Sequence, residues 1–269
     1  MPFCPGRQEN PRCPSGNVCG QRPGMFKGAM SRLFEELDYR PTPIGALSLR
    51  RRRELRLGVD IVEVKLGDEH LMSDLFTASE VALAKLGLSK IEGEELDIVI
   101  GGLGLGYTAK AALEDPRIGE VRVIEYLAPV IEWHRRGILP METELAEDPR
   151  CRLVEGDFFA LSATAAGFDP ARPGRPFDAI LGDIDHSPQA WLDTRSASFY
   201  RPEGLRQLAS HLRPDGVFGL WSNEAPDGAF TARLERVFAE VWAEEVRFNN
   251  PYQDREEVQT VYLARCRPC

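Results

Sequence analysis

The chain has 269 residues, with 33 Lys and Arg against 42 Asp and Glu, which gives a formal net charge of −9. This acidic balance argues against a general nucleic-acid binder, which usually carries net positive charge or a concentrated basic face. Hydrophobic residues make up 43% and charged residues 28%, an ordinary globular composition. No apolar run approaches the roughly 18 residues that a membrane-spanning helix needs. We therefore expect a globular protein without a nucleic-acid or membrane partner.

Residues 1–28 show no hydrophobic period and are rich in Pro, Gly and Arg, so we interpret them as a disordered leader. Three of the six cysteines, Cys4, Cys13 and Cys19, lie in this leader at spacings too loose for a metal clamp, and we expect no metal. The leader lacks the apolar core of a secretion signal. We therefore expect a cytoplasmic protein with reduced thiols.

Residues 29–90 are predicted to form a small N-terminal region of strands and helix. The pattern indicates a short helix over residues 31–37 and two antiparallel strands over residues 45–49 and 59–66. The arginines at residues 50–53 are expected on the connection between these strands, where they either face solvent or bind phosphate. A helix is predicted over residues 71–86.

Residues 91–269 are predicted to form the main domain, in which short apolar strands alternate with helices. The strands are expected at residues 96–100, 121–124, 152–154, 177–181 and 217–221, and the helices at residues 107–113, 128–135, 203–212 and 229–240. A closing pair of antiparallel strands is expected at residues 245–248 and 260–264, because no helix separates them. This order predicts an α/β, Rossmann-like sheet that is mostly parallel with an antiparallel last strand.

Glycines gather directly after the first strand of this domain and before the next helix. Gly102, Gly104 and Gly106 allow the backbone to pass close to a ligand there, and the helix N-terminus offers free N–H groups. Glu125 stands 19 positions after Gly106, at the tip of the second strand, where a carboxylate accepts hydrogen bonds from ribose hydroxyls. A dinucleotide fingerprint would place its third glycine at Tyr107, so the spacing favours an S-adenosylmethionine-type nucleoside. The alternative is a tight turn with a surface glutamate.

Further candidate residues follow the second, third and fourth strands. Tyr126 adjoins Glu125, Asp157 is placed to reach the adenine amino group, and Phe158 to pack on the ring. Asp183 ends the fourth strand, and the carboxyl ends of strands are where open α/β sheets bind ligands. Asp183 is therefore predicted to contact both cofactor and substrate, unless it only caps a turn.

Two more residues follow Asp183 in the chain. Asp185 and His186 are predicted to act as acid or base, or to hold an amine. For His186 the alternative is an ordinary solvated histidine.

Together these residues resemble those of spermidine synthase and its relatives, the aminopropyltransferases within the class I S-adenosylmethionine-dependent methyltransferase fold. The resemblance covers residues 45–264, including a small N-terminal β-sheet. It implies that Gly102, Gly104, Glu125 and Asp157 hold the nucleoside. It also implies that Asp183 faces the incoming nucleophile, and that the protein forms a homodimer, as proteins of this fold commonly do.

The sequence departs from the aminopropyltransferase pattern at several positions. The aspartate of the family's glycine loop, which holds the aminopropyl end of decarboxylated S-adenosylmethionine, is Gly104 here. The family's segment Asp-Glu-x-x-Tyr-x-Glu falls on residues 74–80, so Ala78 replaces its tyrosine while Glu80 is kept. The signature Asp-Ser-x-Asp-Pro becomes residues 183–187, with its second acid shifted or lost, and Tyr252 lies near the position of the family's C-terminal tyrosine.

The missing loop carboxylate favours intact S-adenosylmethionine, because its own carboxylate would be repelled by an aspartate at residue 104. The leading hypothesis is therefore a spermidine synthase-like methyltransferase that acts on a small molecule, with an amine among the candidates. The first alternative is aminopropyl transfer from decarboxylated S-adenosylmethionine to putrescine or a similar amine. The second is a nucleoside-binding protein without catalysis.

Overall fold

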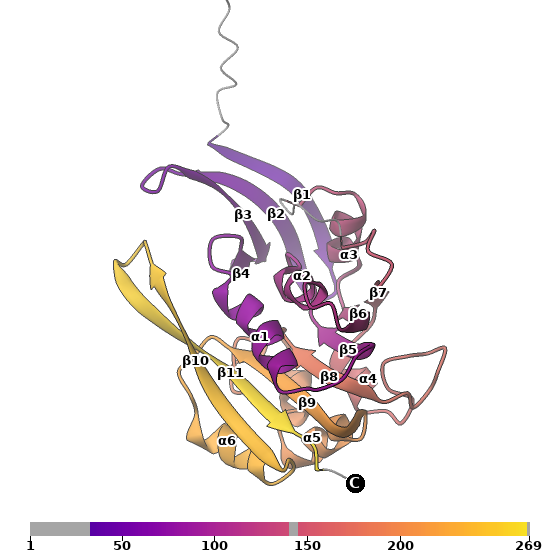
Figure 1. Ribbon diagram of the computed structural model, residues 1–269. Helices are drawn as coiled ribbons and strands as arrows, with labels where there is room; N and C mark the ends of the chain where they lie inside the picture. The colour runs from indigo at the N-terminus through magenta and orange to yellow at the C-terminus, as the bar shows by residue number, and fades with distance from the viewer. Residues whose placement is uncertain (1–32, 140–144, 268–269) are drawn as a thin grey trace, which may run out of the picture. The chain divides into compact units, whose positions relative to one another are not determined.

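The computed structural model describes residues 33–139 and 145–267, which belong to one compact unit of the chain (Figure 1). The interpreted leader at residues 1–28, with its three cysteines, lies outside the described residues. Within the described residues, no helix is both long and apolar enough to cross a membrane.

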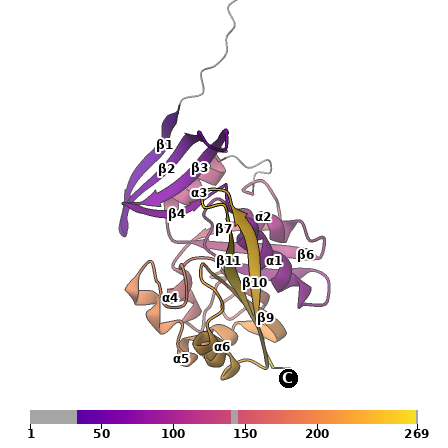
Figure 2. The same cartoon turned by 90° about the vertical axis from the view of Figure 1, so that its left-hand side faces the viewer.

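The N-terminal part is a four-stranded antiparallel sheet with strand order β1-β2-β3-β4 (Figures 1 and 2). Its strands are β1 (Phe34–Thr42), β2 (Gly45–Glu54), β3 (Val59–Leu66) and β4 (Glu69–Ser73). The small sheet predicted for this region is confirmed, but it contains two strands more than expected. The helix predicted over residues 31–37 is wrong for the described residues, because Phe34 and its successors pair with β2 as an edge strand.

The arginines at residues 50–53 lie within β2 and not on a connection, so that expectation is also wrong. Successive side chains of a strand point to opposite faces, and each arginine finds an acid on a neighbouring strand. Arg52 Nε lies 2.9 Å from Glu63 Oε2 on β3, and Arg51 NH1 lies 3.5 Å from Glu35 Oε2 on β1. These pairs neutralise the basic run, which leaves it poorly suited to hold phosphate.

The helix predicted over residues 71–86 is divided between two elements. Leu71 and Met72 belong to β4, where Met72 pairs with Val64 of β3. The helix α1 (Ala78–Ser89) begins only after this strand. Leu71, Met72 and Leu75 are spaced as on one face of a helix, but pairing with β3 overrides that local signal. This difference matters for function, because it brings Met72 into the site described below.

The main domain is a seven-stranded sheet with strand order β10-β11-β9-β8-β5-β6-β7. Its strands are β5 (Leu96–Gly101), β6 (Ile118–Glu125), β7 (Cys151–Glu155), β8 (Phe177–Gly182), β9 (Leu212–Ser222), β10 (Glu240–Asn250) and β11 (Arg255–Arg265). Strands β5 to β9 pair in parallel, whereas β11 pairs antiparallel with both β9 and β10. The predicted α/β, Rossmann-like sheet is therefore confirmed, including its antiparallel closing pair.

The helices of this domain are α2 (Tyr107–Leu113), α3 (Ala128–Arg135), α4 (Phe158–Ser162), α5 (Pro202–Ala209) and α6 (Gly228–Glu235), with a 3-10 helix η1 at Thr194–Ser198. The predicted helices at residues 107–113 and 128–135 match α2 and α3. The predicted helices at residues 203–212 and 229–240 end early in the structure, since Leu212 and Glu240 already begin β9 and β10. Neither α4 nor η1 was predicted, because both are only five residues long.

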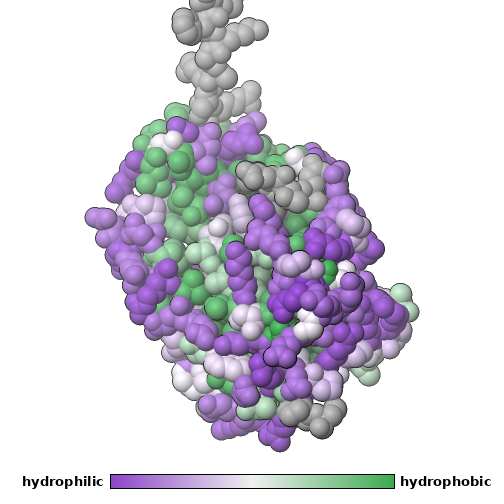
Figure 3. Space-filling view, in the orientation of Figure 1, coloured by the Kyte–Doolittle hydropathy of each residue, from purple (hydrophilic) through white to green (hydrophobic). Residues whose placement is uncertain are grey.

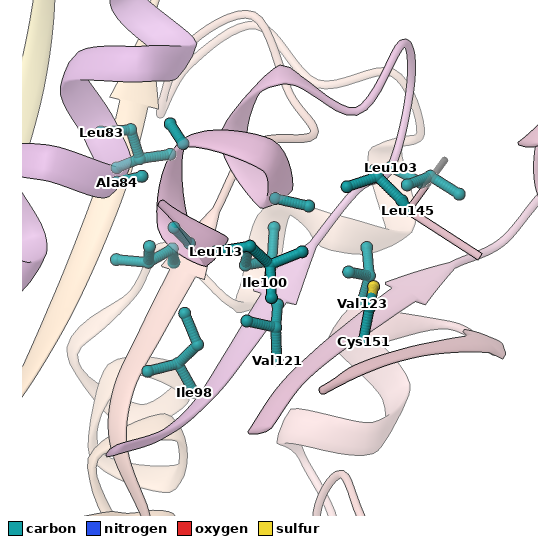
Figure 4. Packing of buried hydrophobic residues seen from close by; sticks show 14 of the residues in the cluster. Leu83, Ala84, Ile98, Ile100, Leu103, Leu113, Val121, Val123, Leu145 and Cys151 are labelled. Carbon is teal, nitrogen blue, oxygen red and sulfur yellow. The ribbon is translucent and has the colours of Figure 1, made fainter. Parts of the chain in front are cut away.

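Alternate residues of the central strands enter two hydrophobic cores. Ile98 and Ile100 of β5 pack with Val121 and Val123 of β6 in the core that α1, α2 and α3 cover (Figure 4). Val99 points to the opposite face, into an aromatic core under α4, α5 and α6. Burial on both faces explains why these strands read as continuous apolar runs. The two packed faces fix the strand ends, and with them the residues of the site.

Exposed apolar side chains occur at one end of the small sheet. Leu33, Phe34, Leu55 and Val59 are each at least 40% exposed, and apolar surface lies over this sheet in Figure 3. The homodimer expected from the resemblance stays a prediction.

Candidate functional site

The loop after β5 passes so close to its neighbours that a side chain at either of two positions would force a neighbour to move. A Cβ atom on Gly102 would lie 2.1 Å from the carbonyl oxygen of Asp183, and one on Gly104 would lie 2.4 Å from Sδ of Met72. Both residues have positive φ, 89° and 48°, which side chains of L-residues rarely allow. The loop therefore lies directly against the end of β8 and against β4 of the small sheet.

Two further contacts fix this glycine loop. The backbone N–H of Leu105 donates to Met72 Sδ at 3.2 Å. His134 Nε2 of α3 lies 2.9 Å from the carbonyl oxygen of Gly104 and must donate, because a carbonyl only accepts. Burial lowers the pKa of His134, so the ring stays neutral at pH 7. Gly106 caps the start of α2 and lines neither of the cavities described below.

Glu125, at the tip of β6, binds the backbone of the same loop. Its Oε2 accepts from the backbone N–H of Leu103 at 2.9 Å, and its Oε1 accepts from that of Leu127 at 2.7 Å. The side chain is buried, which raises its pKa, while the backbone donors oppose the shift. Each carboxylate oxygen has two acceptor positions. The backbone N–H groups of Gly104 and Tyr126 also approach this carboxylate, and Glu125 lines the cavity described below, where it can be reached by a hydroxyl group.

The other predicted nucleoside residues lie around the same space. Asp157 caps α4 by accepting from the backbone N–H of Ala160 through Oδ1 at 3.0 Å, and Oδ2 has no partner among the described residues. Tyr126 is 39% exposed at the rim. Phe158 is 3% exposed and stacks on Phe168 with ring centroids 5.1 Å apart. Phe158 thus belongs to the aromatic core and also lines the cavity described below.

Asp183 follows β8 and shares its surroundings with a second acid, Glu80 of α1. The Thr108 hydroxyl donates to Asp183 Oδ2 at 2.6 Å, and the Ser79 hydroxyl donates to Glu80 Oε2 at 2.8 Å. Burial raises the pKa of both carboxyls, and the charge of Asp183 raises that of Glu80 further. Among the described residues, no Lys or Arg forms an ion pair with either acid. Two buried acids without a cationic partner favour the uptake of a proton or the binding of a cation.

Asp185 and His186 take different positions from Asp183. Asp185 is 2% exposed and accepts from the backbone N–H of Leu192 at 2.8 Å, the Ser196 hydroxyl at 3.0 Å and the Tyr200 hydroxyl at 2.7 Å. These bonds hold the segment that follows β8. His186 Nε2 lies 2.8 Å from Glu69 Oε1 of β4 and lines neither cavity.

The strand-tip residues enclose a cavity of about 680 Å³. Of the predicted site residues, those that line it are Gly102, Gly104, Glu125, Tyr126, Asp157, Phe158, Asp183 and Asp185. Apolar side chains of the small sheet, including Leu47 and Val64, form the opposite wall. The space is large enough for a nucleoside, and two of the residues that line it, Glu125 and Asp157, are acids at strand tips.

A second cavity of about 230 Å³ adjoins the first. The two share Leu71, Met72, Gly104 and Asp183, so these residues mark their junction. The second cavity adds the carboxylate of Glu80, and Asp183 can therefore meet a molecule bound on either side. Within the described residues, no group of three or more His, Cys, Asp and Glu side chains is placed to hold a metal ion.

Met72, Thr108 and His134 were not singled out from the sequence. Met72 was assigned to a helix, and its contact with Leu105 joins residues 33 positions apart. Thr108 contacts Asp183 across 75 positions. A threonine in the first turn of the helix after a glycine loop is a usable sequence signal, but a methionine in an apolar run is not.

Comparison with known proteins adds a fold-level similarity. No protein-family model matches the chain, and no curated protein matches it in sequence. A spermidine synthase structure in complex with the transition-state analogue AdoDATO matches with a TM-score of 0.65 and 18% identity, covering 86% of this chain and 73% of that chain. The Thermotoga maritima spermidine synthase structure matches with a TM-score of 0.62 and 17% identity, covering 86% and 72%. The chain thus has a spermidine synthase-like fold.

Proposed function

We propose that the protein transfers a group from an S-adenosylmethionine-type nucleoside to a small amine, with methyl transfer as the leading reaction. The observation that carries this proposal is the junction of the two cavities at Asp183. One cavity is lined by the strand-tip acids Glu125 and Asp157, and the other holds the buried pair of Glu80 and Asp183. The spermidine synthase-like fold supports a transferase of this class.

The first cavity has the groups that a nucleoside donor needs. Glu125 accepts from the two ribose hydroxyls, and Asp157 Oδ2 accepts from the adenine amino group. Met72 Sδ packs at the place where related enzymes carry a loop carboxylate, so the loop offers no anion to a cationic tail. This arrangement favours intact S-adenosylmethionine over its decarboxylated form.

The donor supplies an electrophilic carbon on a sulfonium, so the protein's task is to position and desolvate the nucleophile. Asp183 and Glu80 bind the amine as an ammonium, and a carboxylate of the pair takes its proton. The nitrogen lone pair then forms the N–C bond while the C–S bond breaks and leaves its electron pair on sulfur. A raised pKa makes Asp183 a better base than an exposed aspartate.

We assign Asp185 a positioning role and not the acid or base role predicted for it, because its oxygens already accept from three donors. It holds Leu192 and Ser196, which line the first cavity. His186 is proposed to link the same segment to β4 through Glu69. Neither side chain needs to touch the reacting atoms.

Aminopropyl transfer is the second candidate, favoured by the acid pair in the amine cavity. Calorimetry with S-adenosylmethionine and with its decarboxylated form compares the two donors directly. Mass spectrometry of an amine panel incubated with each donor then identifies an added methyl or aminopropyl group. Tight binding of a donor without any product would support the non-catalytic alternative, and binding of neither donor would reject the proposal.

A further inference from the structure

On the side of β9 and β11, away from the strand tips that line the first cavity, the second cavity is lined by a chain of side-chain amides. Trp221 of β9 and Gln259 of β11 lie on paired strands, and the Trp221 indole N–H donates to Gln259 Oε1 at 3.2 Å. Gln259 Nε2 in turn donates to Asn223 Oδ1 at 2.7 Å. Because an indole N–H can only donate, it fixes the orientation of both amides. The chain therefore ends on the NH₂ group of Asn223, an exposed residue at the open end of the cavity, and this group has no acceptor among the described residues.

The remaining groups at this end carry no charge. His70 and Ser73 complete the polar lining; His70 is exposed as a residue, but the partial burial of its ring lowers its pKa, which keeps it neutral at pH 7. Two acids lie close by, but both are paired outside the cavity: Glu63 with Arg52 at 2.9 Å and Glu69 with His186 at 2.8 Å.

The charges of the cavity are therefore confined to one side. Among its lining residues, the only acids are Glu80 and Asp183, and there is no Lys or Arg. Between the acid pair and the amide chain the wall is apolar and aromatic, formed by Leu71, Met72, Phe76, Leu103, Tyr107 and Trp221. The cavity thus suits a molecule with one cationic end, an apolar body and a neutral polar end.

We propose that the acceptor is a monoamine whose far end carries a neutral oxygen acceptor, such as a hydroxyl or a carbonyl group, and is not a diamine. This proposal rests on the proposed function for its amine end and adds the chemistry of the opposite end. The ammonium is held by Glu80 and Asp183, and the far oxygen accepts from the Asn223 NH₂ group.

A charged group at the far end, whether an ammonium or a carboxylate, is disfavoured. A second ammonium would meet the Asn223 NH₂ group, which offers it no acceptor, and no carboxylate is present among the lining residues at this end. A carboxylate at the far end would find donors but no cation, and it would lie in one small cavity with two acids. A neutral oxygen meets neither cost.

The test uses three four-carbon probes that differ only at the far end: aminobutanol, putrescine and γ-aminobutyrate. Calorimetry on the full chain with S-adenosylhomocysteine present is expected to show aminobutanol binding about tenfold or more tightly than either other probe. Gln259→Glu places a carboxylate at the far end while keeping an acceptor for Trp221, and is expected to reverse the order in favour of putrescine. Gln253→Glu, an exposed change on the same hairpin, is the matched control and should keep the original order.

Equal or tighter binding of putrescine or γ-aminobutyrate to the unchanged protein would overturn the proposal, as would a lack of binding by all three probes. An unchanged preference in Gln259→Glu would also overturn it. If aminobutanol binds as expected but gives no product with either nucleoside donor, the proposed function fails while the inference about the cavity stands.

Discussion

The proposed ribose contact of Glu125 can be tested with one conservative substitution. Glu125→Gln keeps the size of the side chain but offers one acceptor oxygen where the carboxylate offers two. Two of the backbone donors, Leu103 N–H at 2.9 Å and Leu127 N–H at 2.7 Å, approach different oxygens. One of them will therefore face the new NH₂ group, and one ribose hydroxyl will lose a charged acceptor.

The expected size of the effect follows from these contacts. A hydrogen bond to a charged group contributes about 1.5–3 kcal/mol. Losing one such bond to ribose corresponds to about tenfold to hundredfold weaker binding. Folding stability should change less than affinity, because removing a buried carboxylate offsets part of the cost of the unpaired N–H group.

Calorimetry with S-adenosylhomocysteine measures the affinity, and urea denaturation measures the stability. Glu155→Gln is the matched control, since Glu155 pairs in register with Glu125 on the next strand but is exposed. An affinity of Glu125→Gln within twofold of the unchanged protein would refute the assignment of Glu125 to ribose. A loss of the same size in Glu155→Gln would point to a general effect of charge.

Asp183→Asn is expected to leave S-adenosylhomocysteine affinity within a few-fold but to lower turnover by about a hundredfold; an unchanged rate would remove Asp183 from the reaction. Burial raises the pKa of Glu80, so its favourable contribution is present at low pH and lost as the pH rises through the raised value. In urea denaturation, Glu80→Gln should therefore gain stability relative to the unchanged protein as the pH rises from about 4.5 to about 7; a constant difference would contradict this. Gly104→Ala should lower the melting temperature because its Cβ would lie 2.4 Å from Met72 Sδ, and adding Met72→Ala should recover part of the loss. An unaltered melting temperature in Gly104→Ala would mean that the contact is not tight.

The main domain could be predicted because the hydrophobic pattern of its elements agrees with how those elements are buried in the structure. The strands β5, β6 and β8 are buried on both faces, so their sequences are apolar runs that few other structures allow. The helix α3 begins and ends where its apolar period does. The small sheet has one solvated face and charged strands, and its short elements carry weaker signals. For that reason the sequence pattern predicted a helix where β1 lies, and the start of a helix where β4 lies.

The candidate site divides in the same way. The sequence alone determined the glycine loop and the strand-tip acids, because parallel strands bring their carboxyl ends to one edge and the residues that follow them must meet there. Only the tertiary structure decided that Met72 packs on Gly104, that Glu80 faces Asp183, and that Gln259 closes the second cavity. These contacts join β4, α1 and β11 to the glycine loop and to β8 and β9, segments far apart in the chain. Their geometry depends on how the sheets and helices pack, and no local period or spacing records it.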